Sequence, residues 1–170
     1  DGKIKEIPAD EARAQTLVSS GHNQPGQRTV IVDTKTSKEC PPGVVGEIWV
    51  KGGSVSQGYY QRVEESKEIF HNYLSDSGDG PFLRTGDLGF IKDGEVFVAG
   101  RAKDLIIIRG RNYYPQDIEF VVEHTHEEIR HGCTAAFSIE EEDDEHLVIV
   151  AEVRHAKYQY FSEIIAMIRQ

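Results

Sequence analysis

The clearest indication of the fold comes from residues 84–101, which read RTGDLGFIKDGEVFVAGR. Two apolar runs, residues 88–91 and 96–99, flank the turn signal Lys92-Asp93-Gly94-Glu95. An Asp-Gly pair between such runs is typical of a tight β-hairpin, because both residues tolerate a positive φ angle. The sequence therefore predicts a hairpin in the middle of the chain, with Asp87 just before its first strand and Arg101 at the end of its second.

On the N-terminal side of this hairpin the chain is predicted to be mostly extended. Residues 1–27 are polar and predict a connection, whereas the β-branched and apolar runs at 29–32 and 46–51 predict strands. Residues 62–74 predict a short amphipathic helix, because Val63, Phe70 and Leu74 recur at helical spacing. This half of the chain is therefore predicted to be β-rich.

On the C-terminal side, strands and helices alternate. The apolar residues 105–108 predict a buried strand, and Pro115 is placed to open a helix whose apolar stripe is formed by Ile118, Val121, Val122 and Thr125. Two further strands, 133–139 and 147–153, are expected to be joined by a solvated loop at the acidic run 140–145, and residues 158–170 predict a last helix. This pattern predicts a small α+β unit.

Composition excludes several classes of protein. The 170 residues include 19 Lys and Arg against 29 Asp and Glu, a formal net charge of −10, which argues against nucleic acid as a partner. No apolar run approaches the roughly 20 residues that span a bilayer. The polar start of the chain at Asp1 and the two distant cysteines, Cys40 and Cys133, favour a reduced, cytoplasmic setting.

Asp87 and Arg101 are the candidate binding residues. An ionised carboxylate only accepts hydrogen bonds, so Asp87 can take both hydroxyls of a ribose diol; the alternative is a turn in which Asp87 bonds its own backbone. A guanidinium can fork onto a phosphate or a ribose, and the alternative for Arg101 is a surface ion pair with Asp104 or Glu95. Sequence alone leaves both alternatives open.

Other chemistries find little support in the sequence. His126 and His131 are five residues apart and would not share a helix face, and no fourth ligand stands at a suitable spacing from His124, His131 and Cys133. The chain also contains no nucleophile elbow and no dinucleotide-binding fingerprint. We therefore predict no metal site in this chain.

Read together and in order, three segments resemble the motifs of the adenylate-forming superfamily, which includes acyl-CoA synthetases, peptide synthetase adenylation domains and luciferases. They are GEIWVKGGSVSQGYY at 46–60, RTGD at 84–87 and GRAKDLIIIRGRNYYPQDIE at 100–119. Within this superfamily, residues 80–90 and 103–119 look most like the fatty acyl-AMP ligases. The resemblance covers nearly the whole chain.

The resemblance implies an activity and a role for individual residues. It implies a ligase of fatty acid and lipid metabolism that uses ATP and Mg²⁺ to form an acyl-adenylate and loads it onto an acyl carrier protein of a polyketide or peptide synthase. Asp87 would hold the ribose hydroxyls, Arg101 the ribose or phosphate, and Lys103 would be the hinge. The loop Arg109, Gly110, Arg111 and Asn112 would face phosphopantetheine during transfer.

The resemblance also implies that parts of the enzyme lie outside this chain. The phosphate loop, the magnesium-binding Glu, the acyl tunnel and the catalytic lysine have no counterpart here, and Lys157 does not match that lysine. We expect residues 1–102 to be the distorted-barrel end of a large AMP-binding domain and residues 103–170 an incomplete, mobile α+β domain, inactive by themselves. An acyl-CoA ligase and a non-catalytic acyl-adenylate-binding or regulatory module remain alternatives.

Overall fold

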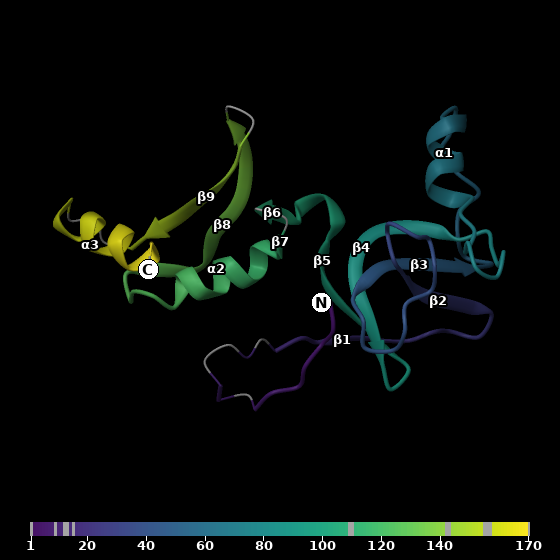
Figure 1. Ribbon diagram of the computed structural model, residues 1–170, viewed down its shortest axis with the longest axis horizontal. Coiled ribbons are helices and arrows are strands. Elements are labelled where there is room, and N and C mark those ends of the chain that lie inside the picture. The colour runs from purple at the N-terminus through teal and green to yellow at the C-terminus, as the bar shows by residue number, and fades with distance from the viewer. Residues whose placement is uncertain are drawn as a thin grey trace. The chain divides into compact units, whose positions relative to one another are not determined.

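The computed structural model describes residues 2–8, 10–11, 14, 16–108, 111–141, 144–154 and 158–169. The chain divides into two compact units, Asp1–Lys103 and Asp104–Gln170. Strands predominate in both, and each unit also carries α-helix, so the chain is a strand-rich α+β segment (Figure 1). The assignment of the two units to parts of a larger enzyme stays a prediction.

The first unit is built on one antiparallel sheet of five strands in the order β1-β5-β4-β3-β2. The strands are β1 (Ser19–His22), β2 (Gln27–Val32), β3 (Gly46–Gly52), β4 (Leu83–Lys92) and β5 (Glu95–Arg101). The strands predicted at 29–32 and 46–51 are confirmed as β2 and β3, which pair from Gln27↔Gly52 to Val32↔Glu47.

The predicted hairpin is confirmed as β4 and β5, and both strands are longer than expected. Its turn has positive φ angles at Asp93 (51°) and Gly94 (81°), the pair of angles that matches the right-handed twist of the strands. Gly89 is needed for close approach, because a Cβ there would lie 2.2 Å from the carbonyl oxygen of Phe97. The two strands can therefore approach each other closely beside Asp87.

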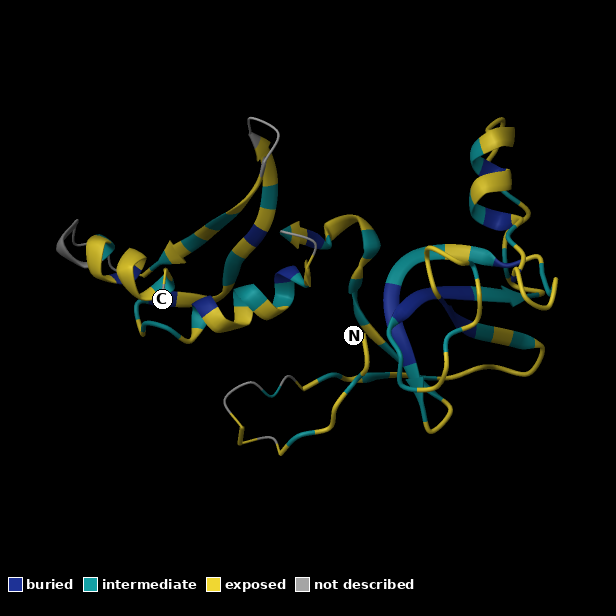
Figure 2. Ribbon diagram, in the orientation of Figure 1, coloured by how far each residue is buried: buried dark blue, intermediate teal, exposed yellow. Residues whose placement is uncertain are grey.

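The core of the first unit lies against β2 and β3. Its buried cluster consists of Val30, Val32, Trp49, Leu74 and Phe82. Figure 2 shows the burial concentrated along these strands and β4 of the sheet, while α1 (Val63–Phe70) is largely exposed. The sheet that carries the candidate residues is thus anchored by a continuous apolar core.

Two predictions for the first unit are wrong in part. Residues 19–22, expected in a polar connection, form β1 and pair with β5. Their sequence, SSGH, lacks apolar alternation because this strand lies at the edge of the sheet. The helix expected through residue 74 ends at Phe70, since Asn72 then forms a β-bridge with Phe82 and Leu74 enters the core.

The second unit contains two hairpins and two helices. β6 (Ile106–Ile108) pairs with β7 (Arg111–Tyr113), and β8 (Ile129–Glu141) pairs with β9 (Asp144–Val153). The helices are α2 (Pro115–Glu123) and α3 (Tyr158–Ile168), and Pro115 stands in the first turn of α2 as predicted. A buried cluster of Val122, Ile129 and Ile164 joins α2, β8 and α3.

Three details of the second unit differ from expectation. Val121 is exposed, so the buried face of α2 is formed by Ile118 and Val122, and Thr125 lies beyond the helix end. The acidic run expected as a loop is largely strand, because Glu140 pairs with Glu145 and Glu141 with Asp144. Residues 111–113 form β7 because they complete a ladder with β6.

No helix in the part of the chain that the structure describes is both long and apolar enough to cross a membrane. Cys40 and Cys133 are free, half-buried thiols.

Candidate functional site

The two candidate residues are direct neighbours in the sheet. Asp87 of β4 and Arg101 of β5 are register partners. Arg101 Nε donates to Asp87 Oδ1 over 3.1 Å, and the side chains are 66% and 34% exposed for Arg101 and Asp87. The structure thus pairs Arg101 with Asp87, whereas sequence had offered Asp104 or Glu95. The charges are held together while both groups stay open to solvent.

Asp87 lies in an irregular stretch of β4. Glu47 of β3 is the register partner of Leu88, and Trp49 that of Arg84, so residues 85–87 face Ile48 alone. Such a bulge re-aims side chains and is common beside active sites. Gly86 has a φ angle of 76°, which a residue with a side chain rarely adopts.

Thr85 holds the bulge in place. Its hydroxyl donates to the carbonyl oxygen of Ile48 over 2.8 Å and accepts from the backbone N–H of Asp87 over 3.0 Å. No hydrogen bond described for the Asp87 carboxylate goes to its own backbone, so the alternative turn is not what the structure forms. The carboxylate therefore projects from the sheet with a fixed backbone beneath it.

An ion pair between the buried Glu47 and the partly exposed Arg84 joins β3 to β4 across the bulge. Glu47 is 2% exposed, and both of its carboxylate oxygens accept from Arg84: Nε lies 3.2 Å from Oε1 and 3.1 Å from Oε2, and Nη2 lies 2.9 Å from Oε2. The Arg84 guanidinium also stands 5.9 Å from the ring centre of Trp49. A bidentate pair of this kind has a defined geometry.

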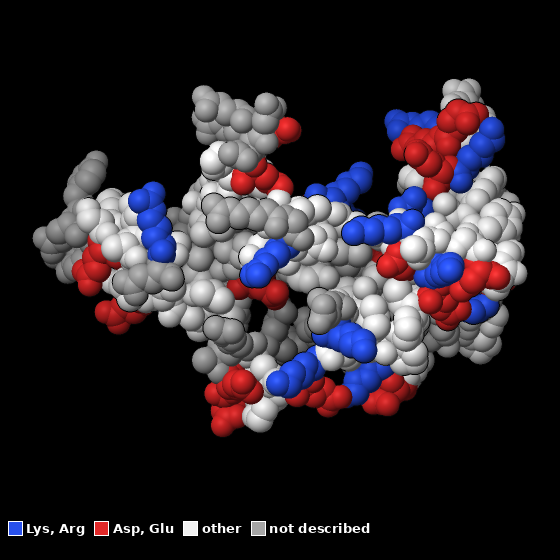
Figure 3. All heavy atoms as spheres, in the orientation of Figure 1, with Lys and Arg blue, Asp and Glu red and all other residues white. Residues whose placement is uncertain are grey.

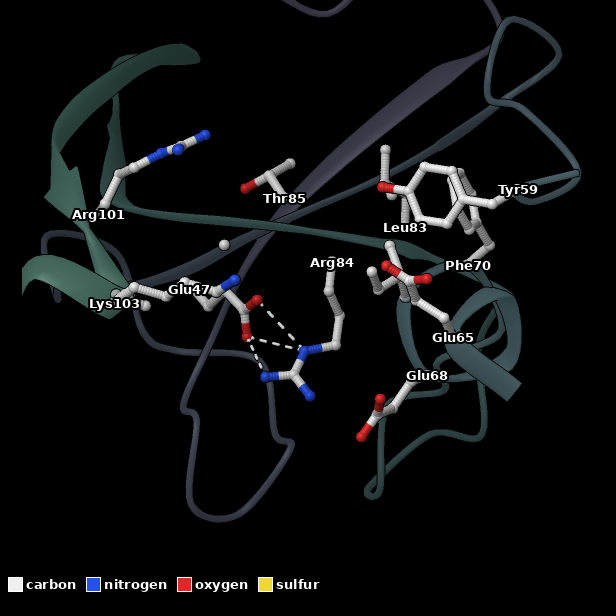
Figure 4. A pocket seen from close by; sticks show the side chains of 13 residues that line it. Glu47, Tyr59, Glu65, Glu68, Phe70, Leu83, Arg84, Thr85, Arg101 and Lys103 are labelled. Atoms are coloured by element: carbon white, nitrogen blue, oxygen red, sulfur yellow. Dashed lines mark hydrogen bonds and ion pairs between the residues drawn. The ribbon is translucent and has the colours of Figure 1, made fainter. Parts of the chain in front are cut away.

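Glu47, Arg84, Thr85 and Arg101 border a cleft of about 730 Å³ in the first unit, and Asp87 is not among the residues that line it. Figure 4 shows the Arg84 guanidinium facing the Glu47 carboxylate, with Arg101 and Lys103 to one side and the rings of Tyr59 and Phe70 to the other. Arg84, Arg101 and Lys103 make one part of the lining cationic, whereas Tyr59, Phe70 and Leu83 are apolar. Glu47, Glu65 and Glu68 also line the cleft, so it offers a ligand cationic, acidic and apolar side chains.

The segment before β4 is tied to the sheet by charge. Asp79 forms ion pairs with Arg28 of β2 and Lys51 of β3. The hydrogen bond from Lys51 lowers the pKa of Asp79 from its usual value, and the positive charges of Lys51 and Arg28 act in the same direction. Lys51 also lies 4.9 Å from the ring centre of the buried Phe82. The chain therefore enters β4 from a fixed position.

The other predicted residues are placed as follows. Lys103 lies in a 3₁₀ turn, Ala102–Asp104, and is the last residue of the first unit. Arg111 and Asn112, expected in a loop, are exposed residues of β7, where they pair with Ile108 and Ile107. Arg109 and Gly110 lie outside the described residues, as does Lys157. Of the predicted site residues, Asp87 and Arg101 thus belong to the five-stranded sheet, and Lys103 follows its strand β5 closely.

Charges of both signs are interspersed on one face of the molecule. On the face shown in Figure 3, Lys and Arg side chains stand beside Asp and Glu rather than gathering in one basic patch. Among the described residues, no group of three or more His, Cys, Asp and Glu side chains could hold a metal ion. His124 and His131 contact each other through their rings, 5.0 Å apart.

Sequence reasoning missed Glu47, Arg84 and Thr85 as residues of the site. One signal was available for Glu47: a carboxylate surrounded by Gly46, Ile48, Trp49 and Val50 in a predicted strand requires a partner if it is buried. Nothing in the spacing identified Arg84 as that partner, because the two residues are 37 positions apart.

Comparisons with known proteins agree with one another. Residues 7–60 match the AMP-binding enzyme family. The chain is 46% identical over 166 residues to the medium-chain-fatty-acid–[acyl-carrier-protein] ligase JamA of Moorena producens, covering 96% of this chain and 28% of the relative. It is 41% identical over 157 residues to the long-chain-fatty-acid–AMP ligase FadD26 of Mycobacterium tuberculosis, covering 90% and 26%.

A solved structure from a study of fatty acyl-adenylate ligases of E. coli and L. pneumophila is also similar. It superposes with a TM-score of 0.75 at 33% identity, covering 98% of this chain and 28% of the other. The chain therefore spans only about a quarter of the length of the curated relatives that it matches.

Proposed function

The chain belongs to the AMP-binding, adenylate-forming superfamily, and on that premise we propose that it is a segment of a fatty acyl-AMP ligase. The proposed enzyme joins a fatty acid to ATP, forming an acyl-adenylate and releasing pyrophosphate. The thiol of a phosphopantetheine on an acyl carrier protein then attacks the acyl carbon and releases AMP. A carrier within a polyketide or peptide synthase is the proposed acceptor.

The paired Asp87 and Arg101 are the observation that supports this proposal most directly. The Asp87 carboxylate shares Oδ1 with Arg101 and still has acceptor capacity for two ribose hydroxyls. Arg101 uses Nε for Asp87, which leaves its two terminal nitrogens to donate to a ribose or phosphate oxygen. One carboxylate and one guanidinium held side by side thus suit the ribose-phosphate part of an adenylate.

Magnesium is expected in the complete enzyme, where its charge would offset that of the phosphates. The described residues contain no acidic or histidine cluster that fits a metal ion, so none of them is assigned to Mg²⁺. The chemical step is likewise assigned to residues outside this segment. The segment itself would contribute Asp87 and Arg101 to the binding of ATP. We therefore expect the 170 residues alone to form no acyl-adenylate.

The finer architecture is also part of the proposal. We infer that the five-stranded sheet completes a distorted barrel in the large domain and that the second unit is the beginning of a mobile C-terminal domain. The division of the chain after Lys103 supports a hinge there, because a hinge needs only a few backbone angles to change. Limited proteolysis of the full-length protein should cut within residues 102–104, and one protected core across them would oppose a hinge.

The activity is tested by product analysis of the full-length protein that contains this segment. It would be incubated with ATP, Mg²⁺ and a panel of fatty acids, together with either CoA or a phosphopantetheinylated carrier protein, and read by mass spectrometry. Acyl-AMP and acyl-carrier without acyl-CoA are expected. Efficient formation of acyl-CoA would make it an acyl-CoA ligase, and absence of any adenylate would indicate a binding or regulatory module.

The role of Asp87 is tested by Asp87→Asn. Because a hydrogen bond to a charged group contributes about 1.5–3 kcal/mol, we expect kcat/KM for ATP to fall about 10- to 100-fold. Asp93→Asn is the matched control, since Asp93 lies in the exposed turn of the same hairpin and Asn also tolerates its positive φ angle. Equal kcat/KM values for the two variants would remove Asp87 from the nucleotide site.

A further inference from the structure

We propose that Glu47 is a positioning residue for the nucleotide site: through Arg84 it holds the bulge of β4 that presents Asp87. This inference rests on the proposed function, because it assigns a role within the same site. Glu47 is assigned no contact with the substrate. It acts on the backbone that carries Asp87, through one ion pair and the strand that the ion pair holds.

The ion pair spans the bulge diagonally. In the β3–β4 register, Glu47 stands opposite Leu88, which follows the bulge, while its ionic partner Arg84 precedes it. The pair therefore links β3, at the position opposite Leu88, to Arg84 at the start of the irregular segment of β4. On the β3 side, residues 85–87 lack regular ladder pairs, so contacts such as the ion pair help to hold this segment against β3.

Burial makes this contact specific. Glu47 is almost fully buried, and Arg84 supplies both of its described side-chain hydrogen bonds, at Oε1 and at Oε2. A buried carboxylate left without its cation is strongly unfavourable, so Arg84 cannot leave this position at low cost. The Trp49 ring beside the guanidinium limits its movement further. Arg84 is thereby held in one orientation at the start of the bulge.

Asp87 depends on the same segment. From Arg84 the chain passes through Thr85, which is bonded to the Ile48 carbonyl, and Gly86, whose positive φ angle turns the strand. The hydroxyl of Thr85 then accepts the N–H of Asp87. A shift at Arg84 would be passed along this short segment to the Asp87 carboxylate and to its contact with Arg101, which is why the pair affects a site that it does not touch.

The test is Glu47→Gln in the full-length protein, with ATP and 2′,3′-dideoxy-ATP compared in an adenylation assay. Gln keeps the shape of Glu but loses the charge that holds Arg84. A misplacement of about 1 Å can cost about 10²-fold, so we expect kcat/KM for ATP to fall by about 10- to 100-fold. The preference for ATP over the dideoxy analogue should shrink as well, whereas KM for the fatty acid should stay the same.

Glu39→Gln is the matched control. Glu39 also accepts from an arginine at 2.9 Å, Arg28 Nη2, but both side chains are 44% exposed and the pair lies away from the bulge. We expect this variant to keep the wild-type preference for ATP. A general loss of folding is detected by thermal unfolding of each full-length variant, and Arg84→Lys provides a second variant that keeps the charge but not the bidentate contact.

Different outcomes would show whether the positioning role of Glu47 or the proposed function itself is wrong. If Glu47→Gln and Arg84→Lys keep the full preference for ATP, or lose activity equally with both nucleotides, the positioning role is wrong. If Asp87→Asn removes the preference while those two variants retain it, the proposed function stands and only the role of Glu47 fails. If wild-type enzyme does not distinguish the two nucleotides, the ribose site itself is wrong.

Discussion

The two units place their charged and apolar residues differently. The first buries a carboxylate, Glu47, in a five-stranded sheet and pairs it with the partly exposed Arg84, and its core includes Trp49 and Phe82. The second has a buried cluster of three residues and keeps ion pairs such as Arg130 with Glu152 on its surface.

That difference matches the demands of a binding site. A site that must hold a ribose needs side chains fixed to within a fraction of an ångström, which a well-packed sheet provides. The second unit leaves several large apolar side chains exposed on β8, β9 and α3, among them Phe137, Val150 and Ile165. Its stability therefore rests on fewer buried contacts. We expect substitutions of buried residues to lower the free energy of unfolding more in the first unit than in the second.

The largest effect is expected from Phe82→Ala. Phe82 is fully buried in the core of the first unit and lies at the entry to β4. Removing a buried phenyl ring costs about 3–5 kcal/mol of the free energy of unfolding. Denaturant unfolding followed by Trp49 fluorescence would measure this loss, and a loss below about 1 kcal/mol would contradict the packing around Phe82.

Ile129→Ala should have the next largest effect and act on the second unit. Ile129 is also fully buried, and truncation of a buried isoleucine costs about 2–4 kcal/mol. The two core clusters share no residue, so the transition seen by Trp49 should keep its midpoint while far-UV circular dichroism shows a second transition shifted to lower denaturant. A Trp49 midpoint that moves with the substitution would show that the units unfold together.

Glu123→Gln tests a smaller, pH-dependent contribution in the second unit. The N–H of Gly132 donates to Glu123 over 2.8 Å and lowers the pKa of that carboxyl, and the charge of His131, whose Nδ1 lies 3.7 Å from Glu123 Oε2, acts in the same direction. A lowered pKa means that the contribution is fully present above about pH 5 and is lost as the pH falls through the lowered pKa.

We therefore expect Glu123→Gln to cost about 1 kcal/mol at pH 7, because one hydrogen bond to a charged acceptor becomes a neutral one. The difference between wild type and variant should narrow in urea unfolding as the pH approaches 3. A difference that stays constant with pH would show that the charge of Glu123 contributes nothing.

Glu152→Gln should have the smallest effect. It is the same substitution as Glu47→Gln at an ion pair of the same kind, but Glu152 is 54% exposed where Glu47 is buried. Exposed pairs contribute little to stability, so the free energy of unfolding should not change measurably. A clear loss would mean that exposure does not explain the contrast between the two pairs.

Much of the fold was predictable because short stretches of sequence favour particular turns, strands and helix starts. The Asp-Gly turn, the β-branched runs of β2 and β3 and Pro115 at the start of α2 each express a backbone preference within a few residues. The misses have the opposite character: β1 and β7 are short, exposed strands without apolar alternation, formed because a neighbouring strand offers hydrogen bonds.

The sequence by itself determined the strand-rich α+β class and pointed to Asp87 and Arg101, because a carboxylate after a glycine and an arginine after a hairpin are visible in the order of residues. Only the tertiary structure decided that these two are partners, that residues 85–87 bulge from the sheet, and that Glu47 meets Arg84. The physical reason is that register and burial depend on which strands pair, and pairing joins residues far apart in the chain.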